Sequence, residues 1–168
     1  MTLAGSPLME DRLRTIFQIV TDWLRFAEAK HGALLAANVA VLVIVAQSLA
    51  NVAMYELSLV GRALLAASAL ISTVSFLPIL RPGRQRPAAS NATPTSLLYF
   101  NEVACVTPQR YLECLFSTLG EKRQPSRFEH DYAGQIVAIS RIACHKFRLF
   151  NWAAATFLLG LVSCLFAY

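Results

Sequence analysis

Residues 33–54 read ALLAANVAVLVIVAQSLANVAM, 22 positions without a single charged side chain. A helix of about 20 apolar residues is long enough to cross the roughly 30 Å hydrocarbon core of a bilayer. Two further stretches pass the same test: residues 59–80, LVGRALLAASALISTVSFLPIL, with Arg62 as the single charge, and residues 149–168, LFNWAAATFLLGLVSCLFAY, with none. The sequence therefore predicts three transmembrane helices. A soluble bundle of buried helices is the alternative, but such helices are rarely so long and so free of charge.

The composition of the whole chain agrees with membrane spans. Of 168 residues, 56% are apolar and only 15% are charged, whereas ordinary globular domains are about 25% charged. This excess of apolar residues excludes a disordered chain and a small disulfide-stapled secreted domain. The length excludes a large α/β enzyme.

The first apolar stretch reads as a retained membrane anchor. It begins only at residue 33 and follows four acidic side chains, whereas a cleaved signal peptide has a short basic start and a brief apolar core close to the N-terminus. The four acids are Glu10, Asp11, Asp22 and Glu28.

Basic residues predict how the chain is oriented in the membrane. Residues 81–148 hold ten lysines and arginines against five acids, the segment before residue 33 holds four, and the link 55–58 holds none. Cytoplasmic loops carry the excess of Lys and Arg, so the N-terminus and the 81–148 loop of this multi-pass membrane protein are expected in the cytoplasm. Basic patches also bind nucleic acid, but membrane sorting accounts for this one and no nucleic-acid partner is expected.

The polar segments are predicted to be helical as well. Residues 1–32 form a cytosolic amphipathic helix with apolar side chains at 13, 16, 17, 20, 24 and 27, the spacing of one helix face. Residues 81–95 are a linker rich in Pro, Ser and Ala, and residues 96–148 form a cytosolic helical region. Within that region Thr107-Pro108 begins a helix, Gly120 ends it, and another starts near 127–129 and runs into the third span. The predicted fold is an all-α membrane protein, with three transmembrane helices and cytosolic helical extensions.

Polar side chains inside the predicted spans allow two interpretations. Ser68, Ser72 and Ser75 share one side of the second span, which suits close helix packing but also a polar pore lining. Asn38 lies about one and a half turns inside the membrane, where its amide needs a partner. It is expected either at a helix–helix contact or in a gate.

No catalytic or metal-binding pattern is evident. The cysteines at 105, 114, 144 and 164 lack C-x-x-C spacing, and the histidines at 31, 130 and 145 are scattered. The chain also lacks a glycine-rich phosphate loop. We therefore expect no enzyme activity, no metal and no cofactor.

Three sequence blocks follow one another along the chain: WLRFAEAK-H-GALLAAN over 23–38, LYFNEVA over 98–104, and Asp131-x-x-x-Gln135-Ile136 followed by Ser140, Ile142 and Lys146-Phe147. Together they resemble the transmembrane effectors of Pycsar antiphage systems. The second block departs from the family pattern at Asn101, where glycine is usual. The resemblance implies a partner cyclase that makes cyclic UMP or cyclic CMP on infection, and an effector that responds by impairing the inner membrane in abortive infection.

A cytosolic nucleotide site would need cations for the phosphodiester and an aromatic platform for the base. The candidate ligand-binding residues are Arg25, Glu28, Lys30, Tyr99, Phe100, Arg141 and Lys146. Lys30 and Lys146 also suit the ends of membrane helices, and Glu28 is expected to pair with a basic residue of another helix. A homo-oligomer is expected. The competing functions are a passive membrane anchor or assembly subunit that binds another protein, and a holin-like toxin that needs no ligand.

Overall fold

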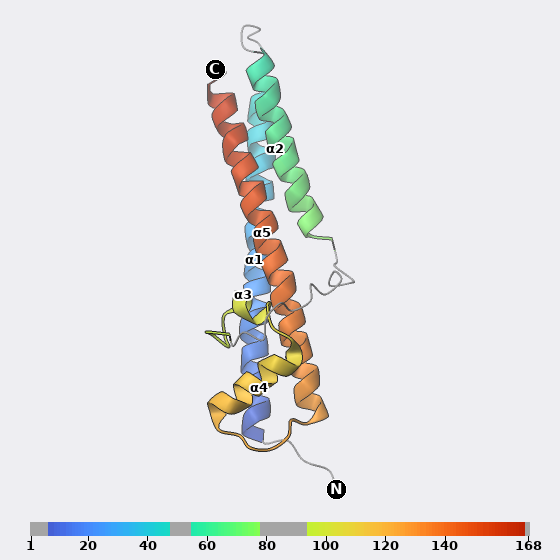
Figure 1. Ribbon diagram of the computed structural model, residues 1–168. Helices are drawn as coiled ribbons and strands as arrows, with labels where there is room; N and C mark the ends of the chain where they lie inside the picture. Colours follow the sequence, from blue (N-terminus) through green and yellow to red (C-terminus); the bar gives the residue numbers. More distant parts are fainter. Residues whose placement is uncertain (1–6, 48–54, 78–93, 167–168) are drawn as a thin grey trace. The chain divides into compact units, whose positions relative to one another are not determined.

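The computed structural model describes residues 7–47, 55–77 and 94–166, and these are organised as helices (Figure 1). The helices are α1 (Pro7–Gln47), α2 (Tyr55–Ser75), α3 (Phe100–Val103), α4 (Pro108–Leu119) and α5 (Arg127–Leu165). The described part of the chain contains no strand. The predicted all-helical class is therefore confirmed for these residues.

Two compact units divide the described chain. The first contains residues 7–25 and 94–145, and the second contains residues 26–47, 55–77 and 146–166. Helices α1 and α5 are each continuous through the point where one unit ends and the other begins. Both units are thus built from parts of the same two long helices.

The first unit has its own apolar core. One face of α1 contributes Met9, Leu13, Ile16 and Val20, which confirms the predicted helical stripe. These side chains pack with α4 and the start of α5, since Tyr111, Leu112, Leu115, Phe116, Ala133, Ile136 and Val137 belong to the same buried cluster.

Helix ends in this unit follow the predicted signals. The Thr107 hydroxyl accepts a hydrogen bond from the Arg110 N–H at 3.1 Å, and Pro108 occupies the first turn of α4. Gly120 ends that helix with a φ of 70°, a left-handed conformation that glycine adopts without a steric penalty. The start of α5 at Arg127 also agrees with the prediction.

The second unit packs α2 closely against α5. A Cβ atom on Gly160 would lie 3.0 Å from the Gly61 carbonyl oxygen and 3.0 Å from the Leu65 backbone nitrogen. Glycine at both positions allows the two backbones to approach each other. Leu65, Cys164 and Val45 form a small buried cluster beside this crossing.

A chain of hydrogen bonds also joins three helices of the second unit. The Asn38 amide donates to Ser68 Oγ at 3.0 Å, and Ser68 Oγ donates to the Ala153 carbonyl at 2.7 Å. Ser68, Ser72 and Ser75 are all buried. In the described state, these serines and Asn38 therefore make helix contacts, one of the two interpretations left open by the sequence.

Two helices, over Leu8–Gln47 and Arg127–Leu165, are long and apolar enough to cross a membrane. The apolar part of α2, Leu59–Ser75, is shorter. The predicted spans 33–54, 59–80 and 149–168, and most of the predicted linker 81–95, extend into residues outside the described ranges.

Candidate functional site

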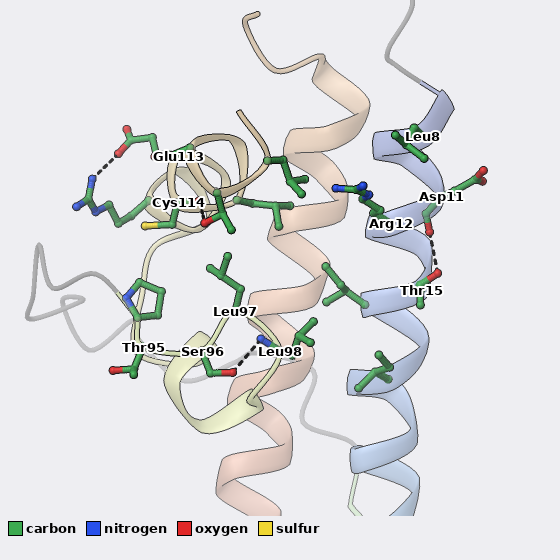
Figure 2. A pocket seen from close by; sticks show the side chains of 18 residues that line it. Leu8, Asp11, Arg12, Thr15, Thr95, Ser96, Leu97, Leu98, Glu113 and Cys114 are labelled. Carbon is green, nitrogen blue, oxygen red and sulfur yellow. Dashed lines mark hydrogen bonds and ion pairs between the residues drawn. The ribbon is translucent and has the colours of Figure 1, made fainter. Parts of the chain in front are cut away.

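A pocket of about 910 Å³ lies in the first unit (Figure 2). One face of α1, the segment 94–98 and one face of α4 form its walls. This volume falls within the range of small-molecule sites, about 300–1,000 Å³. The lining residues are Leu8, Asp11, Arg12, Thr15, Ile16, Ile19, Pro94, Thr95, Ser96, Leu97, Leu98, Arg110, Glu113, Cys114, Leu115, Ser117, Thr118 and Leu119.

Two partly buried hydrogen bonds hold the 94–98 wall in place. The Tyr111 hydroxyl donates to the Leu97 carbonyl at 3.0 Å, and the Ser96 N–H donates to a Glu102 carboxylate oxygen at 2.6 Å. Burial raises the pKa of Tyr111, so its hydroxyl stays protonated and keeps donating at physiological pH. The wall is therefore fixed to α4 and α3.

The charged side chains around the pocket differ in whether they are already paired with another residue. Arg110 forms an ion pair with Glu113 at 3.0 Å. Arg12 is exposed, and no hydrogen bond or ion pair joins it to another described residue. In Figure 2 its guanidinium projects from α1 on the side that faces the other lining elements. A guanidinium with available donors, hydroxyl groups and apolar walls suits an amphipathic ligand with an anionic group.

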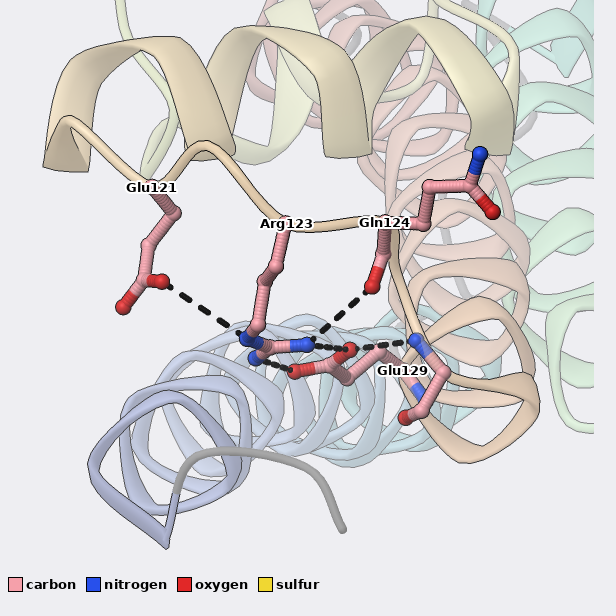
Figure 3. Close-up of polar contacts among 5 residues, drawn as sticks. Glu121, Arg123, Gln124 and Glu129 are labelled. Atoms are coloured by element: carbon pink, nitrogen blue, oxygen red, sulfur yellow. Dashed lines mark hydrogen bonds and ion pairs between the residues drawn. The ribbon is translucent and has the colours of Figure 1, made fainter. Parts of the chain in front are cut away.

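An ion-pair network joins the segment after α4 to the start of α5 (Figure 3). The buried Glu129 carboxylate accepts a hydrogen bond from Arg123 Nη1 at 2.9 Å, pairs with Nη2 as well, and accepts from the Ser126 N–H at 2.6 Å. Ser126 and Glu129 thus form a capping box. Burial alone would raise the pKa of Glu129, but the bonds from Arg123 and Ser126 outweigh burial and hold it below its usual value.

Four of the residues predicted for ligand binding lie in the first unit. Arg25 is exposed beside Asp22, at 3.5 Å. Tyr99 is exposed, whereas Phe100 is buried with its ring 5.4 Å from that of Trp23. Arg141 donates to the carbonyl oxygens of residues 104 and 106, both at 3.0 Å. Phe100 and Arg141 are thus engaged in packing and in holding the α3–α4 connection, and none of the four lines the pocket.

The other three predicted residues lie in the second unit. Lys146 is buried, and its Nζ lies 2.8 Å from Glu28 Oε1. This ion pair between α5 and α1 confirms the partner expected for Glu28. The Lys30 ammonium lies over three aromatic rings, 4.5 Å from that of Phe26 and 5.4 Å from that of Phe150, with Phe147 completing the set. A cation over aromatic faces is stabilised by their quadrupoles.

The sequence reasoning missed the pocket and Arg12. The only available signal was a basic residue on the polar face of an amphipathic helix, which is usually a solvated charge. The cysteines at 105, 114, 144 and 164 are free. Among the described residues no group of His, Cys, Asp and Glu side chains could hold a metal ion.

The described residues thus combine two helices long and apolar enough to cross a membrane with a ligand-sized pocket in one of two compact units. Residues 12–168 match the model of the PycTM family, the Pycsar effector protein domain, and the chain belongs to that family. It is therefore an effector of antiphage defence. No curated protein and no solved structure matches the chain.

Proposed function

We propose that a cyclic pyrimidine mononucleotide, cyclic UMP or cyclic CMP made by a partner cyclase, binds the pocket of the first unit and causes the second unit to impair the inner membrane. The result is abortive infection. Family membership supports the defence role and the nucleotide signal. The single observation that carries the choice of site is the pocket of about 910 Å³ with Arg12 among its lining residues.

The proposed membrane arrangement has three spans in a homo-oligomer. Large apolar side chains of the second unit support it because they lie exposed along all three of its helices, where lipid or another copy would cover them. The ten basic residues of the 81–148 loop support a cytoplasmic position for that loop and for the N-terminus. A cytoplasmic first unit would meet a soluble nucleotide made inside the cell.

The pocket suits the two chemical parts of such a nucleotide. Its phosphodiester carries one negative charge, and the Arg12 guanidinium can donate to two of its oxygens. Apolar side chains such as Leu97 and Ile16 can cover the base and sugar, and hydroxyls such as those of Thr95 and Ser117 can bond their polar edges.

Direct binding tests this site. Cyclic UMP, cyclic CMP, cyclic AMP and cyclic GMP are titrated calorimetrically into the detergent-purified full chain. One pyrimidine nucleotide should bind, and Arg12→Gln should weaken its affinity about 10- to 100-fold, the value of one charged hydrogen-bond pair. Arg14→Gln is the matched control, because Arg14 is an exposed arginine of the same helix outside the pocket lining.

A competing proposal is that the nucleotide binds the seven residues predicted from the sequence instead of the pocket. The same titration distinguishes the two sites. Loss of affinity in Arg25→Gln or Tyr99→Ala, with Arg12→Gln behaving as the parent, would move the site away from the pocket. Absence of binding for all four nucleotides would contradict the signalling role. It would favour a passive anchor or a ligand-independent toxin.

Membrane impairment is tested in cells with a voltage-sensitive dye. Cells that contain the effector should keep their membrane potential until the bound pyrimidine nucleotide is produced, and then depolarise. Depolarisation without the nucleotide would indicate a holin-like toxin. A stable potential in its presence would indicate an anchor.

A further inference from the structure

The second unit contains a line of buried polar side chains, here called the polar seam. Its members are His31 and Asn38 on α1, and Ser68, Ser72 and Ser75 on α2. Four of the five are fully buried and Ser75 is 3% exposed. Asn38 and the three serines lie within the predicted spans 33–54 and 59–80, and His31 lies two positions before the first of these spans.

The contacts between α1 and α2 establish the order of these side chains. Asn38 bonds Ser68, and the ring of His31 lies 6.3 Å from that of Phe76. The two helices are therefore antiparallel, with Ser75 near the level of His31 and Ser72 between the two ends. Asn38 lies seven positions after His31, about 10 Å along the helix.

Four atoms of the seam have no hydrogen-bond partner among the described residues. They are Nδ1 of His31, Oδ1 of Asn38 and the Oγ atoms of Ser72 and Ser75. His31 Nε2 lies 3.0 Å from the Lys146 carbonyl oxygen, so Nε2 donates this hydrogen bond and Nδ1 is the ring nitrogen left without a partner among the described residues. Unpaired polar atoms are costly in an apolar surrounding, and buried polar groups normally bond protein or water.

We propose that the polar seam holds a file of water molecules when the effector is active, and that this file forms one section of a path along which protons cross the membrane. About three waters with hydrogen bonds of about 2.8 Å would span 10 Å. A proton from one side bonds to Nδ1 of His31 or to the file, and another leaves at the opposite end. The file keeps its number of protons, and one positive charge has moved along this section down the proton gradient.

An apolar cluster closes the seam in the described state. Leu65, Val45 and Cys164 are buried together, with Val41, Leu42 and Phe157 packed against them. Along both α1 and α2 this cluster lies beyond the Asn38–Ser68 bond, on the side away from His31. An apolar constriction blocks conduction by excluding water, so an effector at rest conducts nothing.

Proton flux into vesicles tests this inference, which rests on the proposed function for its trigger. The full chain is reconstituted in phosphatidylethanolamine–phosphatidylglycerol vesicles that contain a pH-sensitive dye and calcein. With cyclic UMP or cyclic CMP outside, protons should enter while calcein stays inside. Ser72→Ala with Ser75→Ala should slow the flux about tenfold because the file loses two of its bonding groups.

Thr73→Ala is the matched control. Thr73 lies between the two serines on α2, and its hydroxyl is exposed and bonds the Ala69 carbonyl. This variant should conduct as the parent does. Ser72→Ala and Ser75→Ala break no hydrogen bond of the described structure, so both proteins should fold. Equal proton flux in the double variant and the parent, or escape of calcein together with protons, would overturn the seam.

A second variant separates the seam from its trigger. Leu65→Ser places a hydroxyl in the apolar cluster and should admit protons without nucleotide, about tenfold faster than the parent. If no nucleotide changes the parent's flux, the proposed signalling fails. The polar seam is then supported if Leu65→Ser conducts protons and the addition of Ser72→Ala and Ser75→Ala to that variant lowers its proton flux. Any other result contradicts the seam.

Discussion

Lys146 Nζ on α5 lies 2.8 Å from Glu28 Oε1 on α1, across 118 positions of sequence. The lysine side chain is 7% exposed, whereas that of the glutamate is 43% exposed. The buried ammonium therefore depends on a partly solvated carboxylate as its counter-charge. Because of this difference in exposure, removal of the Glu28 charge leaves a buried charge without a partner, whereas removal of the Lys146 charge leaves a partly solvated one.

Glu28→Gln should lower the thermal stability of the detergent-purified protein. It leaves the buried Lys146 ammonium without a counter-charge, and we expect a loss of about 2 kcal/mol, reduced from the value of a fully buried pair because Glu28 is partly solvated. Melting curves followed by circular dichroism measure the change. Arg25→Gln is the control: its partner Asp22 lies 3.5 Å away with both side chains more than 70% exposed, so its melting temperature should not change.

Arg141→Met should destabilise the α3–α4 connection. The Arg141 guanidinium is bonded to two backbone carbonyls, and their loss should cost about 1–3 kcal/mol. Protection from hydrogen exchange should fall first in residues 100–107. Arg148→Met, at an exposed position of the same helix, should leave that protection intact. Unchanged exchange in Arg141→Met would show that the two hydrogen bonds contribute nothing.

Some of this architecture was predictable from sequence and some was not. The buried positions 13, 16 and 20 follow from helical spacing, and the ends of α4 follow from the residue types at Thr107 and Gly120. The acceptors of Arg141 are backbone carbonyls at least 35 residues away. Every residue has a backbone carbonyl, so the residue types at these positions could not indicate this contact. The pocket depends on three segments that meet only after folding.

Acid should weaken the first unit through Glu129. Its pKa is lowered in the folded protein from an ordinary value of 4.5, so its contribution to stability is complete above pH 4.5 and is lost as the pH falls through the folded value. Glu129→Gln should lower stability at pH 7 by about 2 kcal/mol and flatten the acid dependence. Glu113→Gln, at an exposed ion pair, should keep the parent's pH profile. If Glu129→Gln kept the parent's dependence of stability on pH, the Glu129 carboxylate would not be the cause of the acid sensitivity.

Two glycines of α5 should respond oppositely to a single methyl group. A Cβ at Gly160 would lie 3.0 Å from backbone atoms of Gly61 and Leu65, whereas a Cβ at Gly134 meets nothing within 4 Å. Gly160→Ala should destabilise the second unit by about 1–3 kcal/mol through overpacking. Gly134→Ala should be neutral or stabilise the helix by up to about 1 kcal/mol. Equal melting temperatures for the two variants would show that α2 and α5 do not need this close approach.

The core of the first unit joins α1 to α5 across more than 100 residues, from the Met9–Val20 stripe to Ala133–Val137. During synthesis, α1 and α2 leave the ribosome well before the residues that complete this core. In the proposed arrangement, the first two spans enter the bilayer while the first unit is still unfinished. Two of the three proposed spans are therefore inserted before the walls of the pocket are complete, whereas the third, at the end of α5, is made after them. In this arrangement, a nucleotide present during synthesis finds a complete pocket when only the third span remains to be made.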